Sequence, residues 1–509
     1  MQDQPKSHFE RLLKPILASR FLTISALIHL LIIVLFGGKV LFNKYVEPPD
    51  FQSAGEGGSD NSPPAPPETP TETLPPQPTV APPPPPTSSL NTITSFNNTS
   101  SVGFSMPLPA MAPPTISKNL SSQAQTQTFG HGVVALPGVM GGRTGAARQS
   151  TGEKYGEKAA AEQSVMRALR WLQTKQHTDG TWGGNRGAFT GLSLLCYLGH
   201  GETPETSHEF SVVVSNAIGA MVTEGNRSHG QLSFQGSLAS GPAPYIHGIC
   251  TYAICEAYTM TKDERLVPII KEAVDYIIKG QRPDGGWAYS YDITGDVGDA
   301  IKSDTSVCGW QIQALKAAHL TGIPGMEDKV RPVLDLAMKN MDRVFNPKDG
   351  SFGYRKAGDH NYSLTGVGVL AKLFWLGRPD RTVRMGIKNI QTVDVKYRSA
   401  GCLLYSWYYN TQACYQAQGS AWDWWNSRFQ DQLTSTQSED GSWPPCGLPP
   451  PPLKPGQKPV ATNGFFNGTG EDDLLFRTTL CTLMLEVYYR YLPTSKDTSL
   501  SGGGGDEGL

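Results

Sequence analysis

Beyond residue 156, apolar positions follow a helical period in alternating kinds of segment. In residues 161–176, Val165, Leu169 and Leu172 recur at the spacing that places them on one face of an amphipathic helix. The next helical segment, residues 189–199 (FTGLSLLCYLG), is apolar throughout and rich in small residues. An amphipathic helix followed by an apolar one predicts a hairpin whose second helix is buried on all sides.

A short polar phrase joins the two helices of four such pairs. It has the form Gln/Asn-x-x-Asp-Gly-x-Trp/Phe and occupies residues 176–182, 281–287, 346–352 and 437–443. Four matches at one internal spacing indicate a repeat. Asp-Gly favours a tight turn, Gln and Asp can bind backbone groups left open at helix ends, and the aromatic ring covers the joint. The residues assigned to this structural repeat are Gln176, Asp179, Trp182, Gln281, Asp284, Trp287, Asp349, Phe352, Gln437, Asp440 and Trp443.

Two further pairs lack the phrase but keep the helical pattern. They are residues 210–222 with 245–260 and residues 381–390 with 400–417. The total is then six helical hairpins. Closed in a ring, with the small-residue helices inside, they form an all-α (α/α)6 toroid, which we predict for residues 156–492.

The repeated phrase resembles the QW-type repeat of squalene and hopene cyclases and of protein prenyltransferase β subunits. It is especially similar to the prenyltransferase/squalene oxidase repeat proteins attached to membrane anchors in planctomycete-like bacteria. Residues 422–445 (WDWWNSRFQDQLTSTQSEDGSWPP) carry the closest likeness, and the resemblance spans about residues 156–492. It implies the toroid fold, but one fold hosts many functions, so it does not fix an activity.

The resemblance suggests two catalytic motifs to look for. Squalene-hopene-type cyclases use an Asp-x-Asp-Asp acid, which is absent here. The nearest cluster is Glu471, Asp472 and Asp473 before the last inner helix, where acids also suit the positive helix end. We retain Asp472 and Asp473 as catalytic candidates, with helix capping as the alternative.

Protein prenyltransferases hold zinc with Asp, Cys and His near the starts of inner helices. The matching residues here are Asp304, Cys308 and His360, all of types that bind zinc. The family's Asp-x-Cys spacing is stretched to four residues in this chain. Asp304 and His360 are therefore catalytic candidates, and the three residues together are a weak zinc candidate. The alternative is that Asp304 caps a helix, Cys308 fills the core and His360 lies in a loop.

Long connections from outer to inner helices should meet at one end of the ring, and long loops are often functional. Residues 288–304 (AYSYDITGDVGDAIKSD) contain the densest polar and aromatic set. It could bind Ca²⁺ or a glycan, as aromatic-lined toroid clefts do in polysaccharide lyases; a solvated acidic loop is the alternative. The ligand-binding candidates are Tyr289, Tyr291, Asp292, Asp296, Asp299 and His247, the last also interpretable as a core histidine.

Near the N-terminus, Phe21–Gly38 carries no formal charge and has about the length needed to span a bilayer. More Lys and Arg precede this span than follow it, which places residues 1–20 in the cytoplasm and the bulk across the inner membrane. Ser25 and His29 share a helical face within the span. This motif resembles TonB-type anchors and implies an ExbB/ExbD-like partner; a histidine tolerated in a simple tether is the alternative.

Composition completes the domain plan. Residues 39–155 are rich in Pro, Ser and Gly and predict a disordered linker, and residues 493–509 predict a disordered tail. With 43 basic and 45 acidic residues, the chain lacks the basic field of nucleic-acid-binding proteins. The eight cysteines form no CxxC pair, and their pairing stays open.

These features favour a membrane-anchored extracytoplasmic module that binds or scaffolds an unknown glycan or protein ligand, with no cofactor. One alternative is a cyclase-, prenyltransferase- or polysaccharide-lyase-like enzyme, which would show a deep pocket where acids meet His247 or His360. A second alternative is a TonB-like transducer. A scaffold should instead show a cavity plugged by side chains and an exposed apolar or aromatic patch.

Overall fold

The computed structural model describes residues 126–129, 132–135, 138–234, 237–239, 241–294, 303–359, 364–376, 380–399, 401–447 and 467–493. The predicted span, including Ser25 and His29, lies outside these residues, as does the predicted tail beyond residue 493. Within the described ranges, no helix has the length and apolar character needed to cross a membrane.

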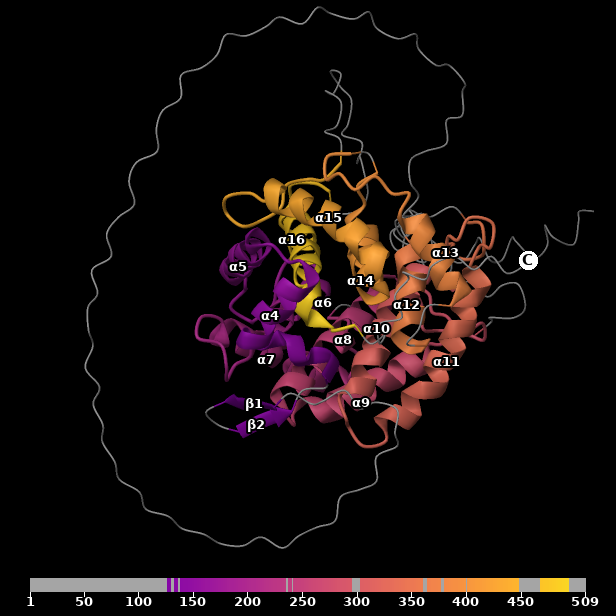
Figure 1. Ribbon diagram of the computed structural model, residues 1–509. Coiled ribbons are helices and arrows are strands. Elements are labelled where there is room, and N and C mark those ends of the chain that lie inside the picture. The colour runs from indigo at the N-terminus through magenta and orange to yellow at the C-terminus, as the bar shows by residue number, and fades with distance from the viewer. Residues whose placement is uncertain are drawn as a thin grey trace, which may run out of the picture. The chain divides into compact units, whose positions relative to one another are not determined.

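The described helices between residues 159 and 485 form two concentric sets. In the inner set each helix contacts the next, and the last contacts the first, so the set closes a ring (Figure 1). Each inner helix is preceded in the chain by an outer helix, which gives the six predicted hairpins. The inner helices are α6 (Arg186–His200), α8 (Ala243–Thr261), α10 (Thr305–Leu320), α12 (Thr365–Leu376), α14 (Leu404–Ala417) and α16 (Glu471–Leu485). The outer helices are α5 (Ala159–Thr174), α7 (Ser211–Ser228), α9 (Leu266–Lys279), α11 (Met326–Val344), α13 (Arg381–Ile390) and α15 (Gly419–Thr436).

The sequence patterns explain which helices lie inside. Outer helix α9 buries one stripe, formed by Leu266, Ile269, Ile270, Ala273, Val274 and Ile277, whose spacing matches a helical face. Inner helix α14 is buried at every residue, because one side packs on outer helices and the other faces the ring centre. Small residues let inner helices approach closely: a Cβ on Gly366 would lie 2.7 Å from the backbone nitrogen of Asn410.

In three of the turns, the repeat's glutamine fastens its own turn to the next outer helix. Gln176 Nε2 donates to Gly180 O (3.1 Å) in its turn and to Val213 O (2.9 Å) in α7. Gln281 and Gln437 make the same pair of bonds, with their own turns and with α11 and α5 respectively. The last of these bonds joins the end of the ring to its beginning.

The repeat's glycines are required by both backbone conformation and space. Their φ values lie between 78° and 96°, in the left-handed region that favours glycine. A Cβ on Gly285 would lie 2.1 Å from Leu336 O in α11, and the corresponding distance is 2.3 Å at Gly180, 2.4 Å at Gly350 and 2.3 Å at Gly441. Any side chain here would push the neighbouring outer helix away.

Each tryptophan of the repeat is fully buried and hydrogen-bonded. Its indole N–H donates to the carbonyl ten residues earlier, near the C-terminal end of the preceding outer helix, where carbonyls lack helical partners. These bonds run from Trp182 to Leu172 (2.8 Å), from Trp287 to Ile277 (2.7 Å) and from Trp443 to Leu433 (2.9 Å). Each of the four phrases is therefore the joint between the outer and the inner helix of one pair.

The structured part begins earlier than the expected boundary at residue 156. A 3-10 helix, η2 (Gly138–Arg143), and helix α4 (Gly145–Tyr155) both contact α17 (Val487–Arg490), the short helix after α16. Arg143 is buried; its Nη1 donates to Glu256 (2.7 Å) in α8 and its Nε to Arg490 O (2.9 Å). The composition does not reveal this segment, because its anchors form no apolar stripe: they are buried Met140, Arg143 and the ion pair of Arg148 with Glu162.

A short β-hairpin also lies within the expected linker. Strands β1 (Thr126–Phe129) and β2 (Gly132–Ala135) pair antiparallel, with Thr126 opposite Ala135. These strands precede the predicted all-α ring and lie in a segment for which composition predicted a disordered linker. Alternation over four residues is too short a signal to predict a strand in a segment rich in polar residues.

Candidate functional site

The ring has two unlike ends. In all six pairs the outer helix precedes the inner one, so the inner helices begin at the end that carries the repeat turns. A contact between two helix starts supports this arrangement. Tyr405 OH donates to Ser306 O (2.9 Å), and the two residues lie in the first turns of α14 and α10 respectively. The opposite end, where inner helices finish, is closed by the Arg143 contacts.

At the end of the ring where the inner helices begin, Asp304 is a buried carboxylate. It is 1% exposed and caps α10: its Oδ1 accepts bonds from Ser306 N (2.8 Å) and Ser306 Oγ (2.6 Å). Its other oxygen, Oδ2, is buried without a well-formed hydrogen bond, although the Tyr354 hydroxyl lies beside the carboxylate. Burial raises the pKa of Asp304, and the surrounding hydrogen bonds offset only part of that rise.

Four tyrosines, Tyr245, Tyr289, Tyr354 and Tyr405, lie around the start of α10, which Asp304 caps, and are called the tyrosine cluster below. The rings of Tyr245 and Tyr289 are nearly parallel, with centroids 6.2 Å apart, and Tyr405 lies 6.4 Å from Tyr245. Tyr354 interacts with both Tyr289 and Asp304. Tyr245, Tyr289 and Tyr354 are partly exposed, so aromatic rings and a buried acid are presented together.

Next to the tyrosine cluster, side chains fill the ring. The ring of Trp310 contacts Tyr245 and stacks on Tyr408, with centroids 5.4 Å apart in the second pair. Gln313 Nε2 donates to Tyr409 OH (3.0 Å) and its Oε1 accepts from Tyr408 OH (3.2 Å). The tyrosine cluster is thus backed by a packed aromatic layer.

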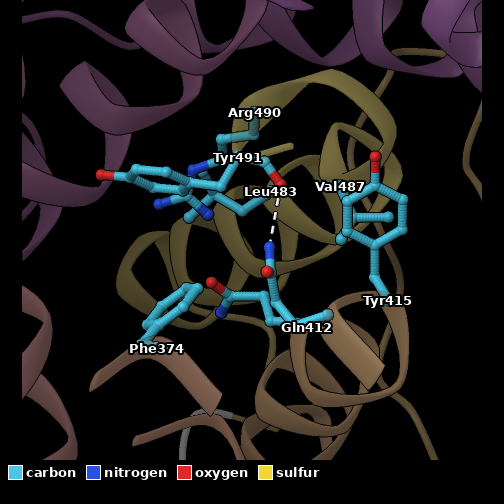
Figure 2. A pocket seen from close by; sticks show the side chains of 8 residues that line it. Phe374, Gln412, Tyr415, Leu483, Val487, Arg490 and Tyr491 are labelled. Atoms are coloured by element: carbon cyan, nitrogen blue, oxygen red, sulfur yellow. Dashed lines mark hydrogen bonds between the residues drawn. The ribbon is translucent and has the colours of Figure 1, made fainter. Parts of the chain in front are cut away.

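A small cavity lies deeper, toward the closed end (Figure 2). It measures about 10 Å³, which is about the room that one water molecule needs. Phe374, Gln412, Tyr415, Arg490 and Tyr491 are among its lining residues. A substrate-sized molecule does not fit in this cavity.

Two of the predicted ligand-binding residues belong to the core. His247 is fully buried; its Nδ1 accepts from Leu232 N (3.1 Å) and its Nε2 lies 3.0 Å from Ala273 O. Burial lowers the pKa of His247 to about 4, so the ring is neutral and Nε2 is the donor. Tyr291 OH donates to Gln311 Oε1 (2.8 Å) and its ring packs on His247. Neither His247 nor Tyr291 takes part in the contacts between the tyrosine cluster and Asp304.

Of the acids in the predicted ligand-binding set, the structure describes Asp292, and its side-chain hydrogen bonds stay within its own turn. Asp292 is exposed and its Oδ1 accepts from Thr294 N (2.9 Å) in its own turn. Asp296, Asp299 and His360 lie outside the described residues.

Asp472 and Asp473 have structural partners. The carboxylate of Asp472 accepts from Gly184 N (2.7 Å) and Asn185 N (3.2 Å), which ties the start of α16 to the start of α6. Asp473 Oδ2 accepts from Gly470 N (3.1 Å), so this acid in the first turn of α16 binds the backbone N–H of the N-cap residue. These contacts favour the capping interpretation over the catalytic one.

The zinc hypothesis finds no support among the described residues. Cys308 Sγ accepts from Trp287 N (3.2 Å), and burial raises the pKa of its thiol, which disfavours the thiolate that zinc needs. No group of three or more His, Cys, Asp or Glu side chains in the described ranges is placed to hold a metal.

Sequence reasoning singled out Tyr289 and Asp304 but missed Tyr245, Tyr354 and Tyr405. Their signal is weak: Tyr245 and Tyr405 each lie within the first three residues of an inner helix, and Tyr354 follows a repeat turn by two residues. Helix starts from different hairpins meet only once the ring is closed.

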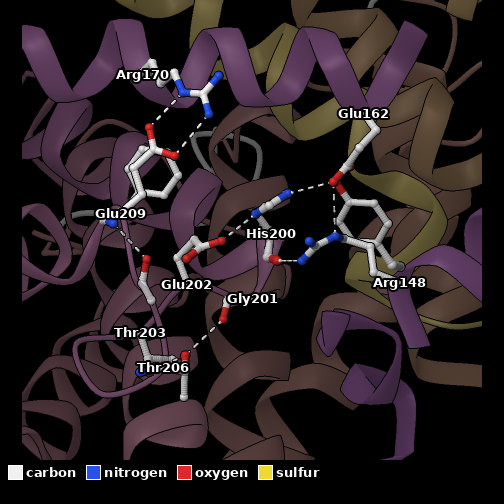
Figure 3. A network of polar contacts seen from close by, with 12 residues as sticks. Arg148, Glu162, Arg170, His200, Gly201, Glu202, Thr203, Thr206 and Glu209 are labelled. Atoms are coloured by element: carbon white, nitrogen blue, oxygen red, sulfur yellow. Dashed lines mark hydrogen bonds and ion pairs between the residues drawn. The ribbon is translucent and has the colours of Figure 1, made fainter. Parts of the chain in front are cut away.

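Two larger surface hollows, of about 480 and 400 Å³, flank α4 near the closed end. Their walls include Arg148, Glu162, His200 and Glu202, which already bind one another (Figure 3). Because these polar groups are engaged in holding α4 to the ring, the hollows rank below the tyrosine cluster as a ligand site.

In the same network, His200 lies between two carboxylates. Its Nδ1 is 2.7 Å from Glu202 Oε1 and its Nε2 is 3.0 Å from Glu162 Oε1, so both nitrogens donate (Figure 3). Burial and nearby Arg148 lower the pKa of His200, but the two carboxylates outweigh them and the net pKa is raised. The same contacts lower the pKa of Glu162 and Glu202 against the effect of burial.

We expect His200 to stay protonated at a higher pH than an ordinary histidine. Its stabilising contribution is complete below about pH 6.5, the unfolded value, and is lost as pH rises through the raised folded value. An NMR titration of the imidazole should show the raised pKa, and Glu162→Gln should lower it. An unshifted pKa in the wild type would contradict the doubly donating arrangement.

Comparison with known proteins gives structural likenesses alone. No protein-family model matches the chain, and no curated protein matches it in sequence. It is similar in structure to the GH76A alpha-1,6-mannanase of Salegentibacter sp. HEL1_6, with 13% identity over 65% of this chain and 98% of that one, at a TM-score of 0.45. The type II terpene cyclase MstE from Scytonema aligns at 14% identity over 65% of this chain and 98% of that one, with a TM-score of 0.40. A glycosidase aligns at 15% identity over 66% of this chain and 98% of that one, with a TM-score of 0.41. At these scores the likenesses carry no inference about activity, and the helical ring rests on the contacts described above.

Proposed function

We propose that this protein is a membrane-tethered, extracytoplasmic binding module that takes a glycan at the tyrosine cluster. The observation that carries the proposal is the Oδ2 atom of Asp304, buried without a well-formed hydrogen bond beside partly exposed tyrosine rings. A buried acceptor without a full complement of donors costs free energy unless a ligand or water supplies one.

A glycan suits these groups chemically. The apolar C–H face of a pyranose ring can lie on an aromatic face such as that of Tyr289, and its hydroxyls can donate to a carboxylate. Binding sites commonly combine apolar and aromatic walls with a few polar groups that fix orientation. The aromatic layer around Trp310 prevents deep insertion, which favours binding of a chain end or a surface segment of the glycan.

The test is direct binding. The full chain in detergent is titrated calorimetrically with soluble oligosaccharides that differ in sugar and linkage. Tyr289→Ala should weaken the binding at least about tenfold, a loss of roughly 1.4 kcal/mol. Asp304→Asn, which keeps a capping side chain, should weaken it similarly.

Trp424→Ala provides the matched control, because Trp424 is a partly exposed aromatic on outer helix α15. It should leave the affinity unchanged. Failure of every oligosaccharide to bind, or binding that survives Tyr289→Ala, would remove the proposal.

Catalysis by Asp304 is a second candidate function, favoured by the raised pKa of its carboxyl group. A carboxyl group with a raised pKa stays protonated at a higher pH than an ordinary aspartate, and in that form it can donate a proton to a leaving group or an alkene. Under this alternative the wild type should convert a ligand that it binds, and Asp304→Asn should abolish turnover while binding persists. Bound ligand that the wild type leaves chemically unchanged would favour the binding module.

The tether part of the proposal rests on the uncharged segment Phe21–Gly38. We infer a single pass with residues 1–20 in the cytoplasm, and an ExbB/ExbD-like partner contacted through Ser25 and His29. Site-specific crosslinking from the span should capture such a partner, and His29→Ala should reduce the capture. Crosslinks unchanged by that substitution would leave the span as a simple tether.

A further inference from the structure

All eight cysteines are buried free thiols in this structure, and two of them lie together. Cys402 precedes α14 by two residues, and Cys446 follows Trp443 in the next repeat turn. Cys446 Sγ is 3.6 Å from Cys402 O, and the two thiols interact with each other. We propose that Cys402 and Cys446 are a modification site, a thiol pair that closes to an intramolecular disulfide under oxidising conditions.

The loops that carry the pair are held side by side. Gly447 N donates to Tyr397 O (2.7 Å), and Tyr397 OH donates to Pro444 O (2.7 Å). Arg398 Nη1 adds a bond to Pro445 O (2.5 Å). A disulfide forms without strain only where the backbone already brings the two Cα atoms close. Three bonds between the loops supply that proximity before oxidation.

A third segment fixes the backbone of Cys446. Asn467 Nδ2 donates to Cys446 O (2.7 Å), and Asn467 Oδ1 accepts from Cys446 N (2.8 Å). Both main-chain polar groups of Cys446 are therefore engaged. The backbone of Cys446 is therefore held in place, and rotation of its side chain is the movement that brings its sulfur to Cys402.

The two thiols differ in the way that disulfide chemistry requires. The Cys402 thiol, and then the positive charges of Arg477 and Arg398, lower the pKa of Cys446 against the effect of burial, whereas burial raises the pKa of Cys402. Cys446 is 6% exposed and Cys402 is fully buried. Cys446 is thus the attacking thiolate, and Cys402 is the resolving thiol.

A small-molecule disulfide, such as oxidised glutathione, completes the chemistry. The Cys446 thiolate attacks one sulfur of the reagent, the reagent's S–S bond breaks, and one glutathione thiolate leaves and takes up a proton. Cys402 then loses its proton to solvent and attacks Cys446 Sγ, which releases the second glutathione. The two protein thiols lose two electrons in total, and the reagent gains them.

Neighbouring cysteines are less suited to this step. Cys196 Sγ donates to Thr479 O (3.5 Å) and Cys250 Sγ to Gly187 O (3.2 Å), whereas the carbonyl that Cys446 Sγ approaches (3.6 Å) belongs to Cys402 itself. Cys481 lies near the pair on α16, but burial keeps its pKa well above the ordinary value. The pairing is therefore assigned to Cys402 and Cys446.

The experiment is disulfide mapping of the full chain in detergent after incubation with oxidised glutathione. The chain is denatured, and its free thiols are blocked and counted. It is then cut with trypsin and afterwards with chymotrypsin, because Cys402 and Cys414 share the tryptic peptide between Arg398 and Arg428. A linked Cys402–Cys446 peptide is expected, with six of the eight thiols still reactive after denaturation. Eight reactive thiols, or Cys446 linked to a different cysteine, would overturn the proposal.

Variants separate the two roles. Cys402→Ser should leave Cys446 trapped as a stable adduct with one glutathione, whereas the core control Cys414→Ala should still form the Cys402–Cys446 link. Reduction should lower the melting temperature of the oxidised wild type by roughly 5 °C and leave that of Cys402→Ser unchanged. If Cys402→Ser fails to fold, the linkage map of the wild type still decides. A Cys402–Cys446 link already present before oxidant is added would support the same pairing.

Discussion

Replacing Arg143 with alanine should destabilise the helical ring by about 3–5 kcal/mol, because it strips a buried carboxylate of its partner. Arg143 Nη1 binds Glu256 (2.7 Å), and both side chains are at most 1% exposed. The guanidinium also donates to Leu198 O (3.2 Å) and Arg490 O (2.9 Å), so one side chain joins η2, α6, α8 and α17. Urea unfolding followed by circular dichroism should show the loss.

Two variants calibrate this expectation. Arg170→Ala removes an arginine from an ion pair with Glu209 in which both side chains are largely exposed, and it should cost no more than about 1 kcal/mol. Adding Glu256→Gln to Arg143→Ala should recover part of the loss, because the buried charge that lost its arginine disappears while the Tyr491 hydroxyl still has an oxygen to donate to. An Arg143→Ala chain as stable as Arg170→Ala would show that η2 is not needed to close the ring.

The helix pairs were predictable because each is specified locally. Apolar spacing such as that of Val165, Leu169 and Leu172 fixes which face is buried, and the repeated Asp-Gly turn marks the joint in four of the six pairs. The Arg143 clamp was not predictable. It connects residues 347 positions apart in the chain, Arg143 and Arg490, and no local pattern encodes such a contact.

The candidate site was predictable only in part. Tyr289 and Asp304 lie in one loop whose length and aromatic content attract attention. Tyr245 and Tyr405 come from hairpins far apart in the chain, and only the closed ring brings their helix starts together. His247 was predicted to bind a ligand because histidine is often a functional residue. Its ring instead bonds to the backbone of Leu232 and Ala273 and has a role in packing.

Trp287→Ala should destabilise the ring by about 3–5 kcal/mol, as expected for truncation of a large, fully buried aromatic side chain. The indole fills the joint between α9 and α10, and its N–H donates to Ile277 O (2.7 Å). The backbone of the same residue accepts from Asp304 N (2.7 Å), so the joint also positions the carboxylate of the candidate site. Thermal and urea unfolding of the purified variant measure the loss.

Trp287→Phe separates packing from hydrogen bonding, since Phe352 already occupies the equivalent position of the third repeat. It should retain part of the packing and lose the bond to Ile277, and so cost less than alanine, about 1–3 kcal/mol. If the joint also sets the position of Asp304, the alanine variant should bind oligosaccharide more weakly at temperatures where it is still folded, and the phenylalanine variant should bind nearly as the wild type does. Equal losses of stability in the two variants would assign the tryptophan's role to its hydrogen bond rather than to the volume that it fills.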